Sequence, residues 1–372
     1  MKILFIASNI PSPKRKSNAV ILRIANLLSV NHEVDVIFPK EIIPFWLRNK
    51  LKFKPLFRLN DFKQGSKNIR VFNYLRLPIK SMAFIFIKWF KLALASTKKY
   101  DLIHAHFLFP DGLIAQETSK EMGIPYVVSV RYSDIALLDS VSESSDTFRK
   151  AKSCLINASS VHVLNTYTGN LIQEKLNIPY RVIPHGIDLP HQLNCDYSND
   201  ICQITCVAEF ISLKQIDWVI NAVKSYKGNS NIALQIVGKG PLENQLKALK
   251  EDDDRIQFLG HIPHQEVLNI LMGSNIFVMP STKETFGLVY LEAAATHNAI
   301  IAYHKYSING IFEANEEAIF CAGYADFKDQ LYQLVENPIR VSKLADAALL
   351  KVRDLTWDKI IMSYSNWYYE QG

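Results

Sequence analysis

The segment PSTKETFGLVYLEA, at residues 280–293, combines residue types that suit a ligand rich in hydroxyl and phosphate oxygens. An apolar strand is expected to end there, and Gly287 is expected to open a helix that carries Glu292. Doubly wound folds bind ligands beyond the carboxyl ends of their strands, where a glycine lets helix N-terminal amides approach phosphate or hydroxyl oxygens. Glu292 can accept hydrogen bonds from both hydroxyls of a ribose, and Glu284 in the preceding loop can face a sugar. The alternative is two solvated glutamates on an ordinary helix.

Short β-branched runs alternate with amphipathic helical stretches along the whole chain, which is typical of βαβ units and parallel sheets. Strands are expected at residues 2–7, 33–38, 101–105, 126–130, 160–163 and 181–183, and again at 203–207, 233–237, 256–259, 276–279 and 299–302. These runs are apolar throughout because both faces of such sheets are covered. The rhythm restarts after a polar stretch at residues 188–199, which predicts a linker. The sequence therefore predicts an α/β protein of two doubly wound domains, followed by an aromatic helix at residues 356–369.

Four further segments resemble known turns of one enzyme family: DLIHAH at residues 101–106, VIPHGID at 182–188, LQIVGKGP at 234–241 and FLGHIP at 258–263. Together with residues 280–293, their order and spacing resemble those of the retaining glycosyltransferases of family 4. That resemblance implies the GT-B fold, in which two Rossmann-like domains face each other and a C-terminal helix crosses back to the first domain. It also implies three ranges: an acceptor-binding domain at residues 1–190, a nucleotide-sugar-binding domain at 191–355 and the returning helix at 356–372.

The resemblance assigns roles to single residues. Lys214 would neutralise the diphosphate of a nucleoside diphosphate sugar, and Glu292 would bind its ribose. Glu284 would hold the donor sugar in the catalytic centre, to which His106 and Arg131 would contribute from the first domain. The donor site would be completed by Thr285, Phe286, Gly287 and Leu288, by Ile262 beside the base, and by Gly238 in the second domain's glycine turn.

Neither a cofactor nor a metal ion is expected, because positive groups and helix N-termini replace the metal in that family. No Asp-x-Asp metal motif stands out, and the acidic run at residues 252–254 is expected to be a turn of solvated charges. The cysteines have no usual zinc or redox spacing and are expected to be small buried hydrophobes in a reducing compartment: Cys154, Cys195, Cys202, Cys206 and Cys321.

The sequence departs from the family's pattern at four places. They are a first loop at residues 9–19 with Lys14, Arg15 and Lys16 but no glycine, Ala208-Glu209 in place of Gly-Arg, Arg131 in place of the histidine of His-Gly-Ser-Asp, and His297-Asn298 in place of Gly-Pro. Arg131 can hydrogen-bond a sugar or a phosphate but cannot act as a general base near neutral pH. Both an active transferase with altered phosphate contacts and a non-catalytic partner of another transferase stay open, and the retained Lys214, Glu284 and Glu292 favour the active one.

The segment at residues 40–99 carries 15 basic and two acidic side chains, interleaved with aromatic and aliphatic residues. Such a composition favours docking on an anionic membrane surface, with the rings among the headgroups and the cations facing anionic lipid. The acceptor would then be a lipid-linked glycan. The alternatives are core residues flanked by ordinary surface lysines, and a single-stranded nucleic-acid site, which no binding-module signature supports.

The sequence as a whole predicts a glycosyltransferase of cell-surface polysaccharide synthesis, such as lipopolysaccharide or capsule. The opening apolar run at residues 2–7 is too short for a signal peptide, and no apolar stretch is long enough to span a bilayer. The protein is therefore expected in the cytoplasm, peripheral on the inner face of the cytoplasmic membrane. A soluble-acceptor glycosyltransferase and a sugar-nucleotide epimerase are the alternative enzymes, and both leave the segment at residues 40–99 unexplained.

Overall fold

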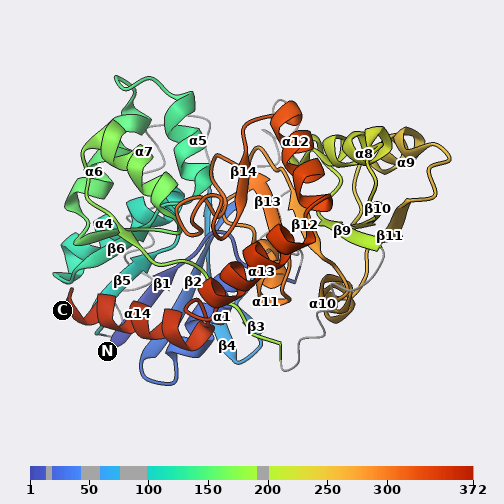
Figure 1. Cartoon of the computed structure of the whole chain (residues 1–372). Helices are drawn as coiled ribbons and strands as arrows, with labels where there is room; N and C mark the ends of the chain where they lie inside the picture. The colour runs from blue at the N-terminus through green and yellow to red at the C-terminus, as the bar shows by residue number, and fades with distance from the viewer. Residues whose placement is uncertain (14–18, 43–58, 76–98, 191–200, 372) are drawn as a thin grey trace. The chain divides into compact units, whose positions relative to one another are not determined.

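The structure is a computed structural model (Figure 1) that describes residues 1–13, 19–42, 59–75, 99–190 and 201–371. Its contacts divide the chain into two compact units. Unit 1 comprises Met1–Val163, Gly169–Ile183 and Ile361–Gly372, and unit 2 comprises Leu164–Thr168 and Pro184–Ile360. The domain ranges given above stay predictions.

The sheet of unit 1 has the strand order β3-β4-β2-β1-β5-β6-β7-β8. Its strands are β1 (Lys2–Ile6), β2 (Glu33–Ile42), β3 (Phe62–Gln64), β4 (Lys67–Leu75), β5 (Leu102–Ala105), β6 (Tyr126–Ser129), β7 (Ser160–Val163) and β8 (Arg181–Val182). All neighbouring pairs are parallel except β3 with β4. Parallel strands end at one edge of a sheet, so the residues that follow β1, β5 and β6 gather there.

Helices join these strands and bury one apolar face each. They are α1 (Val20–Leu28), a π-helical turn η2 (Leu108–Gly112), α4 (Leu113–Met122), α5 (Tyr132–Ser140), α6 (Asp146–Asn157) and α7 (Thr166–Leu176). In α1 the buried side chains, including Val20, Ile24 and Leu28, recur at helical spacing and pack toward the sheet.

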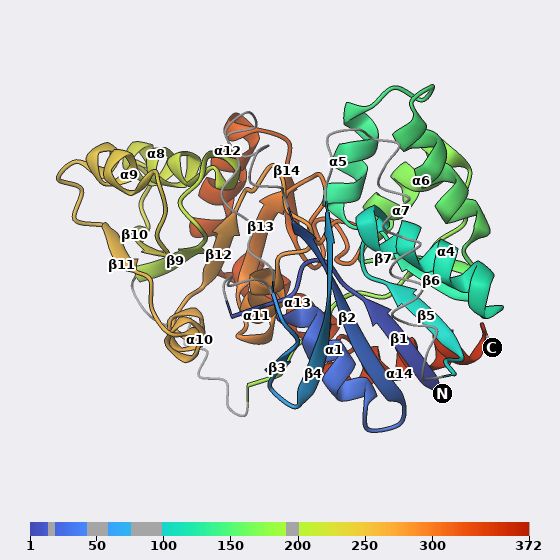
Figure 2. The same ribbon diagram turned by 180° about the vertical axis from the view of Figure 1, so that it is seen from behind.

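The sheet of unit 2 has the order β11-β10-β9-β12-β13-β14, and every pair in it is parallel. Its strands are β9 (Ile201–Val207), β10 (Asn231–Val237), β11 (Ile256–Gly260), β12 (Ile276–Met279), β13 (Ala299–Tyr303) and β14 (Ile319–Cys321). The helices are α8 (Ile216–Ser225), α9 (Glu243–Lys250), α10 (His264–Met272), α11 (Leu288–Ala295), α12 (Tyr324–Val335) and α13 (Pro338–Val352). Helices α8, α9 and α12 pack together on one face of the sheet. Helices α10, α11 and α13 pack together on the opposite face (Figure 2).

Every strand expected from the sequence is present, and the predicted pair of doubly wound parallel-sheet units is confirmed. Strands β3, β4 and β14 were not predicted. The hairpin of β3 and β4 is rich in polar residues, and β14 has only three residues, so neither gave a distinct apolar run.

The last helix, α14 (Trp357–Tyr369), begins in unit 2, and its residues from Ile361 onward belong to unit 1. Tyr364, Trp367 and Tyr368 are fully buried. Their burial explains why the chain ends in an aromatic helix, and the predicted return of this helix to the first domain is confirmed.

Three predictions fall on parts of the chain outside the described residues. They concern the basic residues 14–16 of the first loop, most of the linker at 188–199, and most of the basic segment at 40–99.

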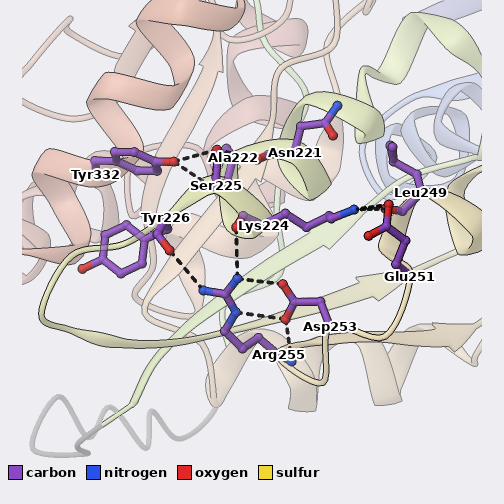
Figure 3. Close-up of polar contacts among 10 residues, drawn as sticks. All are labelled: Asn221, Ala222, Lys224, Ser225, Tyr226, Leu249, Glu251, Asp253, Arg255 and Tyr332. Carbon is purple, nitrogen blue, oxygen red and sulfur yellow. Dashed lines mark hydrogen bonds and ion pairs between the residues drawn. The ribbon is translucent and has the colours of Figure 1, made fainter.

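The acidic run at residues 252–254 forms part of a helix cap (Figure 3). Asp252 and Asp254 are exposed as expected, whereas Asp253 binds Arg255 with both carboxylate oxygens, at 2.9 Å to Nε and 2.7 Å to Nη2. Arg255 also donates to the carbonyls of Lys224 and Tyr226, at the C-terminus of α8. A cation there offsets the negative end of the helix dipole, and hydrogen bonding to Arg255 lowers the pKa of Asp253. Asp253 is therefore a structural residue rather than a solvated charge.

Arg255→Ala is expected to lower the free energy of unfolding by about 1 kcal/mol, because it removes the two-pronged ion pair and the helix cap together. Urea denaturation of the full chain measures this. Asp254→Asn, which changes an exposed neighbouring charge, is the matched control and should change the value by less than about 0.5 kcal/mol. Equal effects of the two substitutions would show that the cap contributes nothing.

Candidate functional site

The loop between β12 and α11 is fixed by one glycine. Gly287 has φ +76°, and a Cβ at this position would lie 2.7 Å from the ring of Tyr290. That ring cannot yield easily, because Tyr290 is fully buried and its hydroxyl donates to the carbonyl of Met279 at the end of β12. Helix α11 therefore starts at Leu288. The amide of Tyr290 already donates to the carbonyl of Gly287, so the amides of Leu288 and Val289 are those that helix geometry leaves available to an anion or a hydroxyl group.

Lys214 and Glu284 meet in this region of unit 2. Lys214 ends the short 3₁₀ helix η3 (Ser212–Lys214) after β9, and its Nζ forms an ion pair with Oε2 of Glu284. The two side chains are only 16% and 18% exposed, so each needs an opposite charge nearby. The other carboxylate oxygen of Glu284 accepts the amide of Thr285 at 3.1 Å.

The carbonyl of Leu213 holds the two loops together. It accepts the amide of Thr282 at 2.9 Å and the hydroxyl of Ser281 at 3.2 Å. Lys214 and Glu284, 70 residues apart in sequence, are therefore brought together by backbone contacts as well as by their own charges.

Ser307 positions the next part of the loop. Its amide donates to the carbonyl of Glu284 at 3.1 Å, and its hydroxyl donates to the carbonyl of Phe286 at 3.1 Å. Asn165 in turn donates to the carbonyl of Ser307 at 2.7 Å. The ring of Phe286 is buried edge-on against His185, so only the backbone of Phe286 is left for a ligand. Sequence reasoning missed Ser307 and Asn165, because no local pattern marks residues so far from the loop.

Glu292 lies on α11 with its side chain 14% exposed, and its Oε1 accepts a hydrogen bond from Nε2 of His264 at 2.9 Å. His264 is the first residue of α10 and follows the half-buried Ile262 closely. The structure therefore places the predicted ribose-binding carboxylate beside the segment predicted to border the base. His264 was missed, although its position after Pro263 at a helix start offered a signal.

Gly238 has a packing role. A Cβ there would lie 1.8 Å from the carbonyl of Ala208, and its amide donates to the carbonyl of Gly260 at 2.8 Å. The backbones of the loops after β9 and β10 are thus in direct contact. Because the amide of Gly238 donates to Gly260, it is not available to a ligand. Glu209, the acid in place of a basic residue, is exposed.

His106 and Arg131 belong to unit 1. His106 follows β5, is fully buried, and neither of its ring nitrogens has a hydrogen-bond partner among the described residues. Arg131, also buried, lies at the N-terminus of α5, and its Nε donates to the carbonyl of His106 at 3.4 Å. Burial and the charge of Arg131 lower the pKa of His106 well below its ordinary value, so the imidazole is neutral.

Two buried carboxyls fix the strand ends around His106. Asp111 accepts the amide of Ser8, after β1, at 3.0 Å, and Asp134 accepts the amide of Arg131 at 2.9 Å. Burial raises the pKa of Asp111, and it raises that of Asp134 to about 6. Neither role was predicted, because nothing local in the sequence distinguishes a buried carboxyl from a solvated one.

Across the described parts of the chain, no three or more His, Cys, Asp or Glu side chains gather as a metal site would require. Within the same residues, no helix has the length and apolar character needed to cross a membrane.

Comparison with known proteins identifies the class. Residues 18–190 match the family model "Glycosyltransferase Family 4", and residues 200–350 match the model "Glycosyl transferases group 1". Two relatives are each 24% identical: the uncharacterized glycosyltransferase MJ1178 of Methanocaldococcus jannaschii, over 73% of this chain and 75% of the relative, and TuaC of Bacillus subtilis (strain 168), over 86% and 85%. TuaC is named as a candidate glycosyltransferase of teichuronic acid biosynthesis.

Among solved structures, Anabaena HepE in complex with UDP and glucose superimposes with a TM-score of 0.67 at 14% identity, over 100% of both chains. The chain therefore belongs to the family 4 glycosyltransferases and has the GT-B fold. The predicted family and fold are confirmed, while retention, metal independence and the individual site residues stay predictions.

Gly287→Ala is expected to lower the free energy of unfolding by about 2 kcal/mol or more, because a left-handed backbone costs about 1–2 kcal/mol and the new methyl group meets the ring of Tyr290. Gly260→Ala is the matched control: it has φ +70° but nothing within 4 Å of the added carbon, so it pays the backbone cost alone. Urea denaturation compares the two variants. Equal losses would contradict the steric argument.

His106 is expected to stay neutral well below the pH at which a free imidazole takes up a proton, because its folded pKa is lowered by burial and by Arg131. In the unfolded chain the imidazole takes up a proton near pH 6.5, so the stability that it contributes is complete above this pH and is lost as the pH falls below it. ¹⁵N NMR titration of the ring nitrogens, assigned with His106→Gln, measures this. The same protein in concentrated urea is the reference, and a folded-state midpoint near pH 6.5 would contradict the expectation.

Proposed function

We propose that this protein is a retaining glycosyltransferase that needs no metal ion and moves a sugar from a nucleoside diphosphate to a lipid-linked glycan acceptor. The setting would be cell-surface polysaccharide synthesis on the inner face of the cytoplasmic membrane. The observation that carries the proposal is the ion pair of Lys214 and Glu284 near the N-terminus of α11 in unit 2.

The donor side of the proposal rests on charge. A diphosphate needs fixed positive partners, which the Nζ of Lys214 and the first amides of α11 can supply. When the diphosphate binds Lys214, the carboxylate of Glu284 is released to accept hydroxyl groups of the sugar. Glu292, which already accepts a hydrogen bond from His264, would accept the ribose hydroxyls as well. The complex of HepE with UDP and glucose supports a uridine diphosphate donor as the first to test.

Transfer would break the bond between the anomeric carbon and the diphosphate oxygen, and the electron pair would leave with the diphosphate. The acceptor hydroxyl oxygen would bond to the same face of that carbon, and its proton would pass to the departing phosphate. Lys214 and the α11 amides stabilise the charge that develops on the leaving group. Arg131 adds a positive charge in unit 1 but no base.

The acceptor side rests on the basic composition of residues 40–99 and on the name of TuaC, which points to surface polysaccharide. A soluble acceptor is the second candidate, and it leaves that composition without a purpose. A non-catalytic partner protein is the third, and Ala208-Glu209 and Arg131 are the features that favour it.

A screen of nucleoside diphosphate sugars by thermal shift, followed by nucleotide release, is expected to find one donor that stabilises the protein and is turned over. Lys214→Ala and Glu292→Ala should abolish the shift, because they remove the diphosphate and ribose contacts. Glu284→Gln should bind the free nucleoside diphosphate at least as tightly as wild type. In this variant no ion pair between Lys214 and residue 284 has to break before Lys214 can bind the diphosphate. Its turnover should fall roughly 100-fold.

Lys283→Ala is the control, since it removes an exposed positive charge beside Glu284 and should change neither binding nor turnover by more than about twofold. A folded wild-type protein that binds no donor would sink the proposal and favour the non-catalytic partner. The membrane part alone would be contradicted if the protein failed to co-sediment with anionic liposomes at low salt.

A further inference from the structure

A chain of hydrogen bonds crosses the sheet of unit 1 inside the protein. The ring of His104, on β5, lies between two hydroxyl groups: its Nδ1 is 2.6 Å from Oη of Tyr368, and its Nε2 is 2.7 Å from Oγ of Ser129. Ser129 ends the neighbouring strand β6, and Tyr368 comes from the C-terminal helix α14. All three side chains are fully buried.

The chain continues on the next strands. Oγ of Ser129 lies 2.6 Å from Nδ1 of His162 on β7, and Nε2 of His162 lies 2.8 Å from the carbonyl oxygen of Ile183, just beyond β8. Ser129 and His162 are register partners in the parallel sheet, so the backbone alone holds them side by side. We call the set Tyr368, His104, Ser129 and His162 the relay.

The far end of the relay dictates the direction of every bond. The carbonyl of Ile183 can only accept, so Nε2 of His162 carries a proton, and its Nδ1 in the neutral ring is an acceptor. Ser129 must therefore donate to His162, and it can then accept only from Nε2–H of His104. Nδ1 of His104 is left to accept from the hydroxyl of Tyr368.

Both imidazoles of the relay are neutral. Burial lowers the pKa of His104 well below its ordinary value, and the neighbouring histidines and Arg131 add to this. Burial followed by the charge of Arg131 lowers the pKa of His162 to about 3. The relay is thus a fixed, uncharged structure with one tautomer at each ring.

The relay contacts the candidate site residue His106 directly. The ring of His104 stacks on that of His106, with 4.0 Å between the ring centroids and 29° between the planes. Phe5 packs edge-on against His106 at 4.4 Å. His106 has no hydrogen bond to a described residue at either ring nitrogen, so these two rings are what fix its orientation there.

We propose that Tyr368 and His104 are positioning residues for His106. Through the directed relay, helix α14 holds the ring of His104, and that ring fixes the plane in which His106 directs its two unpaired nitrogens toward hydroxyl groups of the substrate. This inference rests on the proposed function, because it takes His106 to be a group that touches substrate. A neutral imidazole with both nitrogens unpaired can bind two hydroxyl groups, donating to one and accepting from the other. The C-terminal residues thereby become part of the catalytic apparatus of unit 1 without touching the substrate.

Tyr368→Phe tests this, because it removes one hydroxyl and leaves a buried acceptor on His104 unpaired. Nucleotide release should show kcat reduced at least about tenfold, since an outer partner that orients an imidazole is worth about 10–100-fold. The KM for the donor should change less than about twofold, because Lys214, Glu284 and Glu292 lie in unit 2. In ¹⁵N NMR of the histidine rings, wild type should show His104 and His162 as Nε2–H tautomers, and the resonances of His106 should shift in Tyr368→Phe.

Tyr364→Phe is the matched control. Tyr364 is equally buried on the same helix, but its hydroxyl lies 3.4 Å from a nitrogen of His162 that already donates to Ile183, so the relay survives its loss. Ser129→Ala breaks the relay at its centre without altering the helix and should reproduce the loss of kcat, should Tyr368→Phe fail to fold.

Unchanged kcat in a folded Tyr368→Phe or Ser129→Ala would overturn the positioning role, as would a loss seen equally in Tyr364→Phe. If wild type turns over no donor, the proposed function fails. The NMR measurement tests the positioning role without any need for turnover. His106 resonances that do not shift in Tyr368→Phe would overturn the positioning inference even then.

Discussion

The parallel direction of the strands is the constraint on which the rest of this structure depends. Every parallel strand of a unit ends at the same edge, so the residues that follow β1, β5 and β6 are gathered in unit 1, and those that follow β9, β10, β11 and β12 in unit 2. Lys214 and Glu284, 70 residues apart, meet because β9 and β12 are neighbours. The candidate site residues therefore lie on loops that the parallel sheet brings to one edge.

The two sets of site residues use opposite electrostatic solutions. In unit 2 the partly buried Lys214 and Glu284 form an ion pair, so each side chain has an opposite charge as its neighbour. In unit 1 burial, together with the positive charge of the buried Arg131, keeps the imidazoles of His104 and His106 neutral. Burial raises the pKa of Asp134 to about 6, and its carboxyl oxygens accept hydrogen bonds from backbone amides. The site residues of unit 2 are thus an ion pair, whereas the buried histidines of unit 1 are neutral.

How much could be read from the sequence follows from how local each signal is. The apolar runs of β1 or β12 and the Gly287 turn are local, so the fold and the order of its elements could be predicted. The separate roles of Lys214 and Glu284 were implied by the family resemblance alone, and the ion pair between them was not predicted. Ser307, Asn165, Asp111 and the relay could not be found, because their roles arise from contacts with chain segments more than 20 residues away, as between His104 and Tyr368. Gly238 shows the converse: its motif suggested a ligand, and its packing against Ala208 explains the glycine without one.

Arg131 is the departure from the family pattern that bears most directly on mechanism. A guanidinium cannot accept a proton, and burial together with the charge of Arg131 lowers the pKa of His106 and makes that imidazole a weak base. Glu284 is engaged by Lys214 and by the amide of Thr285. Neither Arg131 nor His106 is thus suited to remove a proton, and in the proposed transfer the proton of the acceptor hydroxyl passes to the departing phosphate. The replacement of histidine by arginine therefore removes a base that the proposed transfer does not need.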